Sequence, residues 1–157
     1  MAVDLKAVPK NDLIALVAGG LAIIVSFISS YVTYDFSDAI GGIKIPGADT
    51  SVGISAWHSW ATIGVLLIIV ATAIVAVRTF APDTLPDTVP WNLVTVAAAG
   101  LGTILVILRA ITVSPGGPGW SGYALFIFAI VLTVVAALNF RASGEKIPEF
   151  GNSKPDA

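Results

Sequence analysis

Residues 57–80 read WHSWATIGVLLIIVATAIVAVRTF, and no charged side chain occurs between His58 and Arg78. An α-helix rises about 1.5 Å per residue, so a run of this length reaches across the ~30 Å hydrocarbon layer of a bilayer. A helix in the core of a soluble protein would rarely be apolar for so long. This stretch therefore predicts a membrane-spanning helix.

Three further stretches of the chain have the same character. They cover residues 13–34, 91–113 and 120–140, and each of the four runs for roughly 21 to 24 residues, enough for one passage through a bilayer. The sequence therefore predicts an all-α membrane protein, in which a bundle of four transmembrane helices forms a single domain over residues 1–141. Glycine and proline are spread along residues 142–157, which we expect to form a short disordered cytoplasmic tail.

The composition agrees with a membrane location and removes several functions. Of the 157 residues, 56% are hydrophobic and 11% are charged, whereas soluble domains carry about 25% charged residues. The chain has no cysteine, which excludes disulfides, thiolate metal sites and cysteine nucleophiles. Its net charge is −2 and it has no cluster of Lys and Arg, so nothing favours binding to nucleic acid.

The positions of the basic residues predict the orientation in the membrane, because positively charged flanks resist translocation. With four spans, both termini lie on the same side. That side would hold six of the basic residues and the other side would hold two, which are respectively Lys6, Lys10, Arg78, Arg141, Lys146 and Lys154, and Lys44 and Arg109. The sequence thus predicts a multi-pass protein of the plasma membrane with both termini in the cytoplasm.

Small side chains at intervals of three or four residues indicate where the helices should meet, because membrane helices associate through close packing. Such pairs occur in all four predicted helices, and examples are Ala18 with Ala22, Ala61 with Gly64, Ala98 with Gly102, and Ala129 with Thr133. The pattern is frequent in membrane helices, which favours packing within the bundle over a dedicated dimer interface. The pattern does not decide whether the chain forms a homo-oligomer.

Arg109 is the main candidate for a functional side chain, because an ionisable group within a membrane span is costly. It lies about one turn from the outer end of the third predicted helix. Its guanidinium can snorkel to the interface or pair with Asp35, Asp38 or Asp49, which lie on the same side. This structural interpretation is favoured, and binding of an anionic lipid headgroup or of a partner's carboxylate is the alternative.

His58 is the one histidine and lies at the outer start of the second predicted helix. A lone histidine at that position is most often an interfacial polar residue. A metal site would need further ligands, and the sequence has no HxH or HxxxH spacing. It also has no GxSxG, HExxH or phosphate-binding glycine motif. We therefore expect no metal, no cofactor and no enzymatic activity.

The first outer loop contains a further pattern. Apolar residues alternate with small or polar ones over residues 43–45 and again over residues 52–54, on either side of Pro46-Gly47. The alternation and the Pro-Gly turn predict a short β-hairpin, which would have to rest on the bundle or on a partner to be stable. The second outer connection, residues 114–119, reads SPGGPG and is expected to be only a tight turn between helices.

The layout resembles the small four-helix integral membrane proteins, mostly of unassigned function, that are found widely in actinobacteria. The residues that carry the resemblance are Tyr31 and Tyr34, Ala56-Trp57-His58, Val89-Pro90-Trp91, Arg109 and Asn139-Phe140-Arg141. The resemblance implies an actinobacterial plasma membrane and supplies no catalytic residues. In outline the chain is also similar to claudins and tetraspanins, but those families rely on cysteines in the large outer loop, which this chain lacks.

These observations predict a non-enzymatic integral membrane protein that serves as an accessory or interaction subunit of a larger membrane assembly. Its expected partners are the lipid bilayer and other membrane protein subunits. One alternative is a small oligomeric transporter or pore, in which faces of Ser, Thr and Gly would line a path. Another is a lipid-binding membrane protein that uses Arg109.

Overall fold

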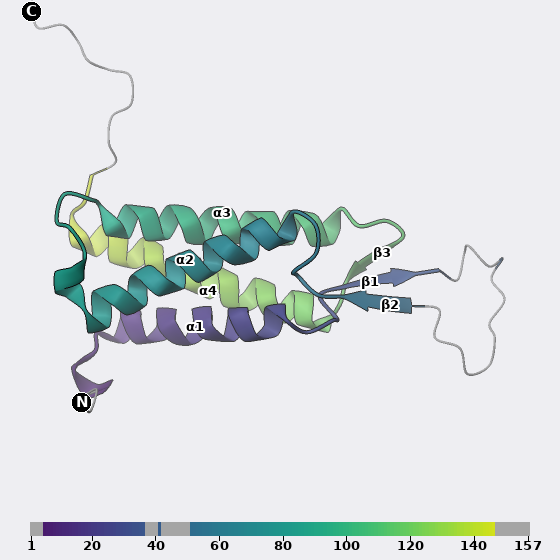
Figure 1. Ribbon diagram of the computed structural model, residues 1–157, viewed down its shortest axis with the longest axis horizontal. Helices are drawn as coiled ribbons and strands as arrows, with labels where there is room; N and C mark the ends of the chain where they lie inside the picture. Colours follow the sequence, from purple (N-terminus) through teal and green to yellow (C-terminus); the bar gives the residue numbers. More distant parts are fainter. Residues whose placement is uncertain (1–4, 37–40, 42–50, 147–157) are drawn as a thin grey trace, which may run out of the picture.

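The computed structural model describes residues 5–36, residue 41 and residues 51–146. They form four α-helices with a three-stranded sheet at one end (Figure 1). Two short 3-10 helices, η1 and η2, lie toward the opposite end. The elements are η1 (Leu5–Ala7), α1 (Lys10–Ser26), β1 (Val32–Asp35), β2 (Ser51–Ile54), α2 (Ala61–Phe80), η2 (Pro82–Thr84), α3 (Trp91–Ile111), β3 (Gly116–Pro118) and α4 (Trp120–Ser143).

The helices form an antiparallel bundle in which each helix packs on two others, in the cyclic order α1, α2, α3, α4. The sheet lies beyond one end of the bundle, which we call the sheet end (Figure 1). The start of α1, the connection between α2 and α3, and the end of α4 lie at the other, which we call the terminal end. All polar connections are thereby collected at the two ends.

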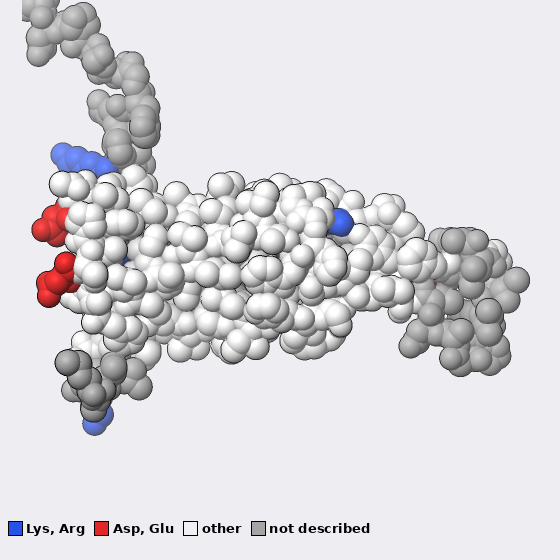
Figure 2. Space-filling model, in the orientation of Figure 1, with Lys and Arg blue, Asp and Glu red and all other residues white. Residues whose placement is uncertain are grey.

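The surface of the bundle is apolar along most of its length. Large side chains such as Ile24, Ile63 and Ile127 are exposed on the outside. Figure 2 shows charged groups gathered at the terminal end, followed by a long band with a single basic group toward the sheet end. In the described part of the chain α2, α3 and α4 are long and apolar enough to cross a membrane, while α1 has 17 residues. The surface is compatible with a membrane location.

Small residues fill the bundle interior, as the crossing of α2 and α3 illustrates. A Cβ atom on Gly64 would lie 2.8 Å from the carbonyl oxygen of Gly102, and a Cβ atom on Gly102 would lie 2.7 Å from that of Gly64. The two backbones therefore approach too closely for any side chain. The predicted small-residue faces are confirmed as packing faces within the chain, since their buried members include Ala18, Ala22, Ala61, Ala98 and Ala129.

The first helix is shorter than the sequence predicts. α1 ends at Ser26, so the expectation of a helix over residues 13–34 is wrong beyond that point. The carbonyl oxygen of Ser26 accepts a hydrogen bond from the backbone N–H of Ala56 at 3.2 Å, and its hydroxyl accepts one from the indole of Trp57 at 3.1 Å. The returning chain thus satisfies polar groups at the helix end, and the aromatic and β-branched residues that follow favour a strand.

The sheet confirms a strand at residues 52–54 but gives it an unexpected partner. β2 pairs antiparallel with β1, with Tyr34 opposite Val52, and the other predicted arm, residues 43–45, lies outside the described residues. β3 pairs with the second edge of β1. The connection at 114–119 is therefore more than a tight turn, and Gly116 makes the pairing possible because a side chain there would collide with the carbonyl of Thr33.

The other helix ends differ from the prediction by a few residues. α2 begins at Ala61 rather than at residue 57, and α3 ends at Ile111 rather than at residue 113. α4 continues past the predicted end at residue 140 to Ser143. It stops there because Gly144 adopts the left-handed conformation, with φ of 71°, that commonly terminates helices.

Candidate functional site

The sheet end places Arg109 under the first strand. Arg109 lies in the last turn of α3, and one of its terminal nitrogens donates a hydrogen bond to the hydroxyl of Tyr34 in β1 at 2.9 Å. Both side chains are partly buried. A guanidinium withdrawn from water needs a hydrogen-bond acceptor, and Tyr34 supplies one here.

Tyr31 fixes the start of the strand to the same helix. Its side chain is 2% exposed, and its hydroxyl donates a hydrogen bond to the backbone carbonyl of Val106 in α3. Burial raises the pKa of this hydroxyl above its ordinary value, and the nearby charge of Arg109 only partly opposes the effect. Tyr31 is therefore a neutral donor that holds the chain against α3.

A small cleft lies between these residues and the second strand. Its volume is about 20 Å³, and its lining includes Tyr34, Ile54, Ser55, His58 and Arg109. A space of this size holds roughly one water molecule, so the cleft has no room for an organic substrate. Its polar groups can order a water or contribute hydrogen bonds to a docked protein surface.

His58 lies at the rim of this cleft and is exposed. Its Nδ1 atom is 3.4 Å from the hydroxyl oxygen of Ser55. A serine nucleophile needs a close base that is itself oriented by a third group, and among the described residues no hydrogen bond to the other ring nitrogen is found. The pair is better explained as polar surface at the boundary of the bundle.

The structure describes part of the predicted acidic set around Arg109. Asp35 is the last residue of β1 and is exposed, whereas Asp38 and Asp49 lie outside the described residues. Pairing of Arg109 with these carboxylates stays a prediction. Within the described ranges no group of three or more His, Cys, Asp or Glu side chains is placed to hold a metal ion.

The terminal end contains a polar cluster that the sequence reading missed. The side-chain amide of Asn139 in α4 donates a hydrogen bond to a carboxylate oxygen of Asp12 in α1 at 2.8 Å. The guanidinium of Arg78 in α2 lies 3.9 Å from the same oxygen. The sequence does place each of these polar residues near the terminal end of its helix. It does not show that they meet, because their contact depends on how the helices pack.

Glu145 makes a second contact at the terminal end. Its carboxylate accepts hydrogen bonds from the side-chain amide of Asn92 at 2.8 Å and from the backbone N–H of Leu93 at 3.1 Å. A negative charge at the first turn of α3 is favourable, because unpaired N–H groups and the helix dipole both attract it. A cleft of about 290 Å³ opens beside this contact, with Arg78 and Trp91 in its lining.

No protein-family model matches this chain, and no similar curated protein or solved structure is found. Its function therefore has to follow from the geometry of its own residues. In the described part of the chain the sheet extends past the bundle (Figure 1). The polar side chains Arg109, Asp12 and Glu145 have hydrogen-bond partners within the chain.

Proposed function

We propose that this chain is a non-enzymatic integral membrane protein, an accessory or interaction subunit of a larger membrane assembly, and that partner subunits recognise it at the sheet end. The observation that carries the proposal is an apolar face of the sheet that starts in the bundle core and continues into the exposed part of the strands.

The strand register defines this face. Directly opposed residues of an antiparallel pair point to the same side, so Val52 shares a side with Tyr34, and Phe36 follows Tyr34 by two residues. The rings of Tyr34 and Phe36 stack with centroids 6.4 Å apart. Phe36 is 44% exposed and Val52 is 52% exposed. Exposed apolar side chains on a sheet fit a surface that docks against another protein.

The proposal includes a four-span arrangement in the plasma membrane with both termini in the cytoplasm. α1 packs against both α2 and α4, so a bilayer that surrounds those helices would surround α1 as well. Its segment from Leu13 to Ser26 carries no charge and would cover about 20 Å. The preponderance of basic residues on the side of the termini supports a cytoplasmic terminal end, and the resemblance to small actinobacterial membrane proteins supports the plasma membrane.

The polar groups inside the bundle favour this function over a transporter or pore. The hydroxyl of Thr103 donates to the carbonyl of Ala99 at 2.7 Å and lies 2.9 Å from the hydroxyl of Thr133 in α4. The hydroxyl of Thr72 donates to the carbonyl of Ile68 at 2.8 Å. These hydroxyls are engaged in helix contacts, which supports a packing role for them over a path for ions or solutes.

The proposal can be tested by site-specific photo-cross-linking in the native membrane. A photoreactive amino acid at position 52 should cross-link to another polypeptide, and purification in mild detergent should give a particle heavier than this chain alone. Position 51 is the matched control, because Ser51 lies on the same strand and faces the opposite side of the sheet. A particle that holds only this chain, with no cross-link from position 52, would contradict the proposal.

A charge on the apolar face provides an independent check. Val52→Glu should release the partner, because burying an unpaired carboxylate in an apolar contact is costly. Ser51→Lys places a full charge on the other face, opposite Asp35, and should leave the assembly intact because opposite charges are compatible across a strand pair. Equal retention of the partner by both variants would place the recognition surface elsewhere.

A further inference from the structure

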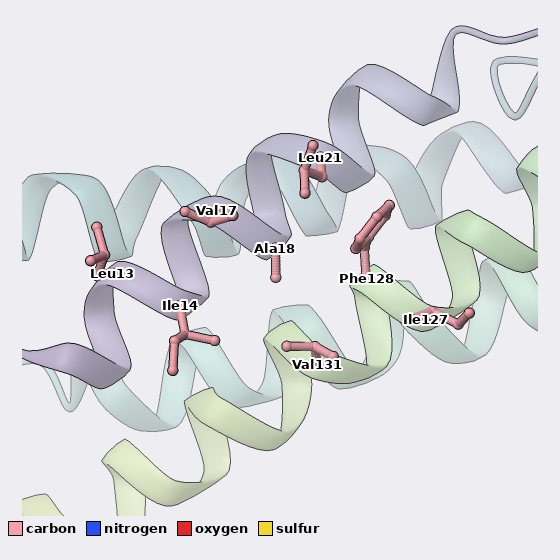
Figure 3. Close-up of a pocket in the computed structure, with 8 residues that line it drawn as sticks. All are labelled: Leu13, Ile14, Val17, Ala18, Leu21, Ile127, Phe128 and Val131. Atoms are coloured by element: carbon pink, nitrogen blue, oxygen red, sulfur yellow. The ribbon is translucent and has the colours of Figure 1, made fainter.

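An apolar groove runs between α1 and α4 on the outside of the bundle (Figure 3). Its volume is about 360 Å³, within the range of about 300–1,000 Å³ that is usual for small-molecule sites. In Figure 3 Ala18 of α1 points toward the space between the helices, and Val131 of α4 lies across from it. The lining is entirely apolar and includes Leu13, Ile14, Val17, Leu21 and Ile127.

The groove cannot be left empty without a cost. Apolar side chains that face a void lose the dispersion contacts that a close neighbour would supply. Ala18 lies in the lining of the groove and is 4% exposed, and its methyl group is too small to fill the space. In a bilayer a flexible hydrocarbon chain is the simplest filler for a narrow groove of this kind.

Basic residues lie at the terminal end of the same two helices. Lys10, Ile14, Val17 and Leu21 are spaced at intervals of four, three and four residues, so they share one stripe of α1. On α4 the intervals from Val131 through Leu138 to Arg141 place Arg141 on the stripe that lines the groove. α1 and α4 pack antiparallel, so the two cations flank the same end of the groove.

The nearest carboxylate in the sequence is Asp12 for Lys10 and Glu145 for Arg141, and both are already engaged. Glu145 accepts hydrogen bonds from Asn92 and Leu93. Asp12 accepts the hydrogen bond from Asn139 and faces Arg78. Lys10 and Arg141 are exposed, so their charges are available to an anion from outside the chain. The groove therefore combines an apolar length with a basic end.

We propose that this groove binds an acyl chain of an anionic phospholipid, whose phosphate lies between Lys10 and Arg141. A second apolar groove, between α2 and α3, has a volume of about 470 Å³. The cation near its terminal end, Arg78, is paired with Asp12. Of the two grooves, the α1–α4 groove alone joins an apolar lining to two exposed cations. The inference rests on the membrane location and is independent of any protein partner at the sheet end.

The preference for an anionic headgroup is tested with the protein in nanodiscs that contain equal amounts of phosphatidylglycerol and phosphatidylcholine. Native mass spectrometry then identifies the lipid that the protein retains. The unmodified chain should retain phosphatidylglycerol in preference. A basic residue near an anionic headgroup contributes roughly five-fold to binding, so Lys10→Gln with Arg141→Gln should reduce the preference at least about ten-fold. Lys146→Gln with Lys154→Gln also removes two positive charges, and this charge-matched control should leave the preference unchanged.

The groove itself is tested with Val17→Trp, which fills it from an exposed position on α1. This variant should retain less lipid of either headgroup, whereas Leu101→Trp, which fills the α2–α3 groove, should not. Thermal unfolding in detergent checks that both variants fold, and if Val17→Trp does not, the charge variants alone decide. An unchanged phosphatidylglycerol preference in the double variant, or a polypeptide cross-linked from position 17, would overturn the proposal.

Discussion

At the scale of single residues, a tyrosine supplies the hydrogen-bond acceptor for Arg109, a partly buried cation at the sheet end. Arg109 donates to the hydroxyl of Tyr34, and the neighbouring Tyr31 donates to the backbone of the same helix. Two tyrosines thus connect the first strand to α3. A neutral tyrosine suits the contact with Arg109, because its phenolic oxygen can accept a hydrogen bond from the guanidinium. Unlike a carboxylate, it adds no second charge that would have to be desolvated.

We predict that Tyr34→Phe lowers the stability of the folded protein by about 1 kcal/mol, because Arg109 loses its acceptor at a partly buried site. Thermal or denaturant unfolding in detergent would measure the change. Tyr123→Phe is the matched control, since Tyr123 is exposed on the outside of α4. Loss of its hydroxyl group should leave the stability unchanged within experimental error. Equal stability of both variants would mean that the Arg109 hydrogen bond contributes nothing to the fold.

The sequence was sufficient to single out Arg109 but not its tyrosine partner. A charged residue within an apolar stretch can be recognised from the sequence alone. The free-energy cost of placing that charge in a membrane follows from the low polarity of the bilayer. The sequence predicts Tyr34 as the last residue of a helix over residues 13–34, where it would have no strand to join. Its hydrogen bond depends on a strand that returns over α3, and that return is a long-range feature.

At the scale of the elements, the closest approach in the bundle is the crossing of α2 and α3. Gly64 and Gly102 each lie against the carbonyl oxygen of the other. Around this crossing α2 and α3 are in extensive contact. Without a hydrophobic force between helices in a bilayer, such close contact provides much of the stabilisation.

Gly64→Ala and Gly102→Ala should each destabilise the bundle by about 1–3 kcal/mol, because the new methyl group has to push the helices apart. Gly20→Ala is the matched control in α1, where a Cβ atom meets nothing within 4 Å. There alanine should be neutral or should stabilise by up to about 1 kcal/mol, since glycine is a poor helix former. Unfolding in detergent measures all three, and similar values for all of them would be inconsistent with a close crossing.

Elements formed by local interactions could be predicted from the sequence, whereas elements formed by long-range interactions could not. Length and hydropathy predict α2, α3 and α4 to within a few residues, because those helices are determined by local sequence and solvent. The end of α1 and the sheet were not predictable in this way. Val32–Asp35 pairs with two segments far away in the chain, and hydropathy does not distinguish a buried strand from the end of a helix.

At the scale of the whole molecule, an uncharged bundle separates two polar ends. The terminal end holds the cluster of Asp12, Arg78 and Asn139, and the sheet end holds Arg109 with its tyrosines. In the proposed arrangement the bilayer covers the band between them and the sheet faces the outside, where a partner subunit can reach it. The proposed lipid would bind beside the bundle with its headgroup at the cytoplasmic side.

The most direct measurement of this arrangement is the side from which single cysteines can be labelled. The chain has no native cysteine, so each introduced thiol reports on its own position. Ser51→Cys and Ser114→Cys at the sheet end should react with a membrane-impermeant maleimide applied to intact cells. Ala7→Cys and Thr84→Cys at the terminal end should react only after the membrane is permeabilised. Labelling of residues 51 and 84 from the same side of the membrane would contradict the account.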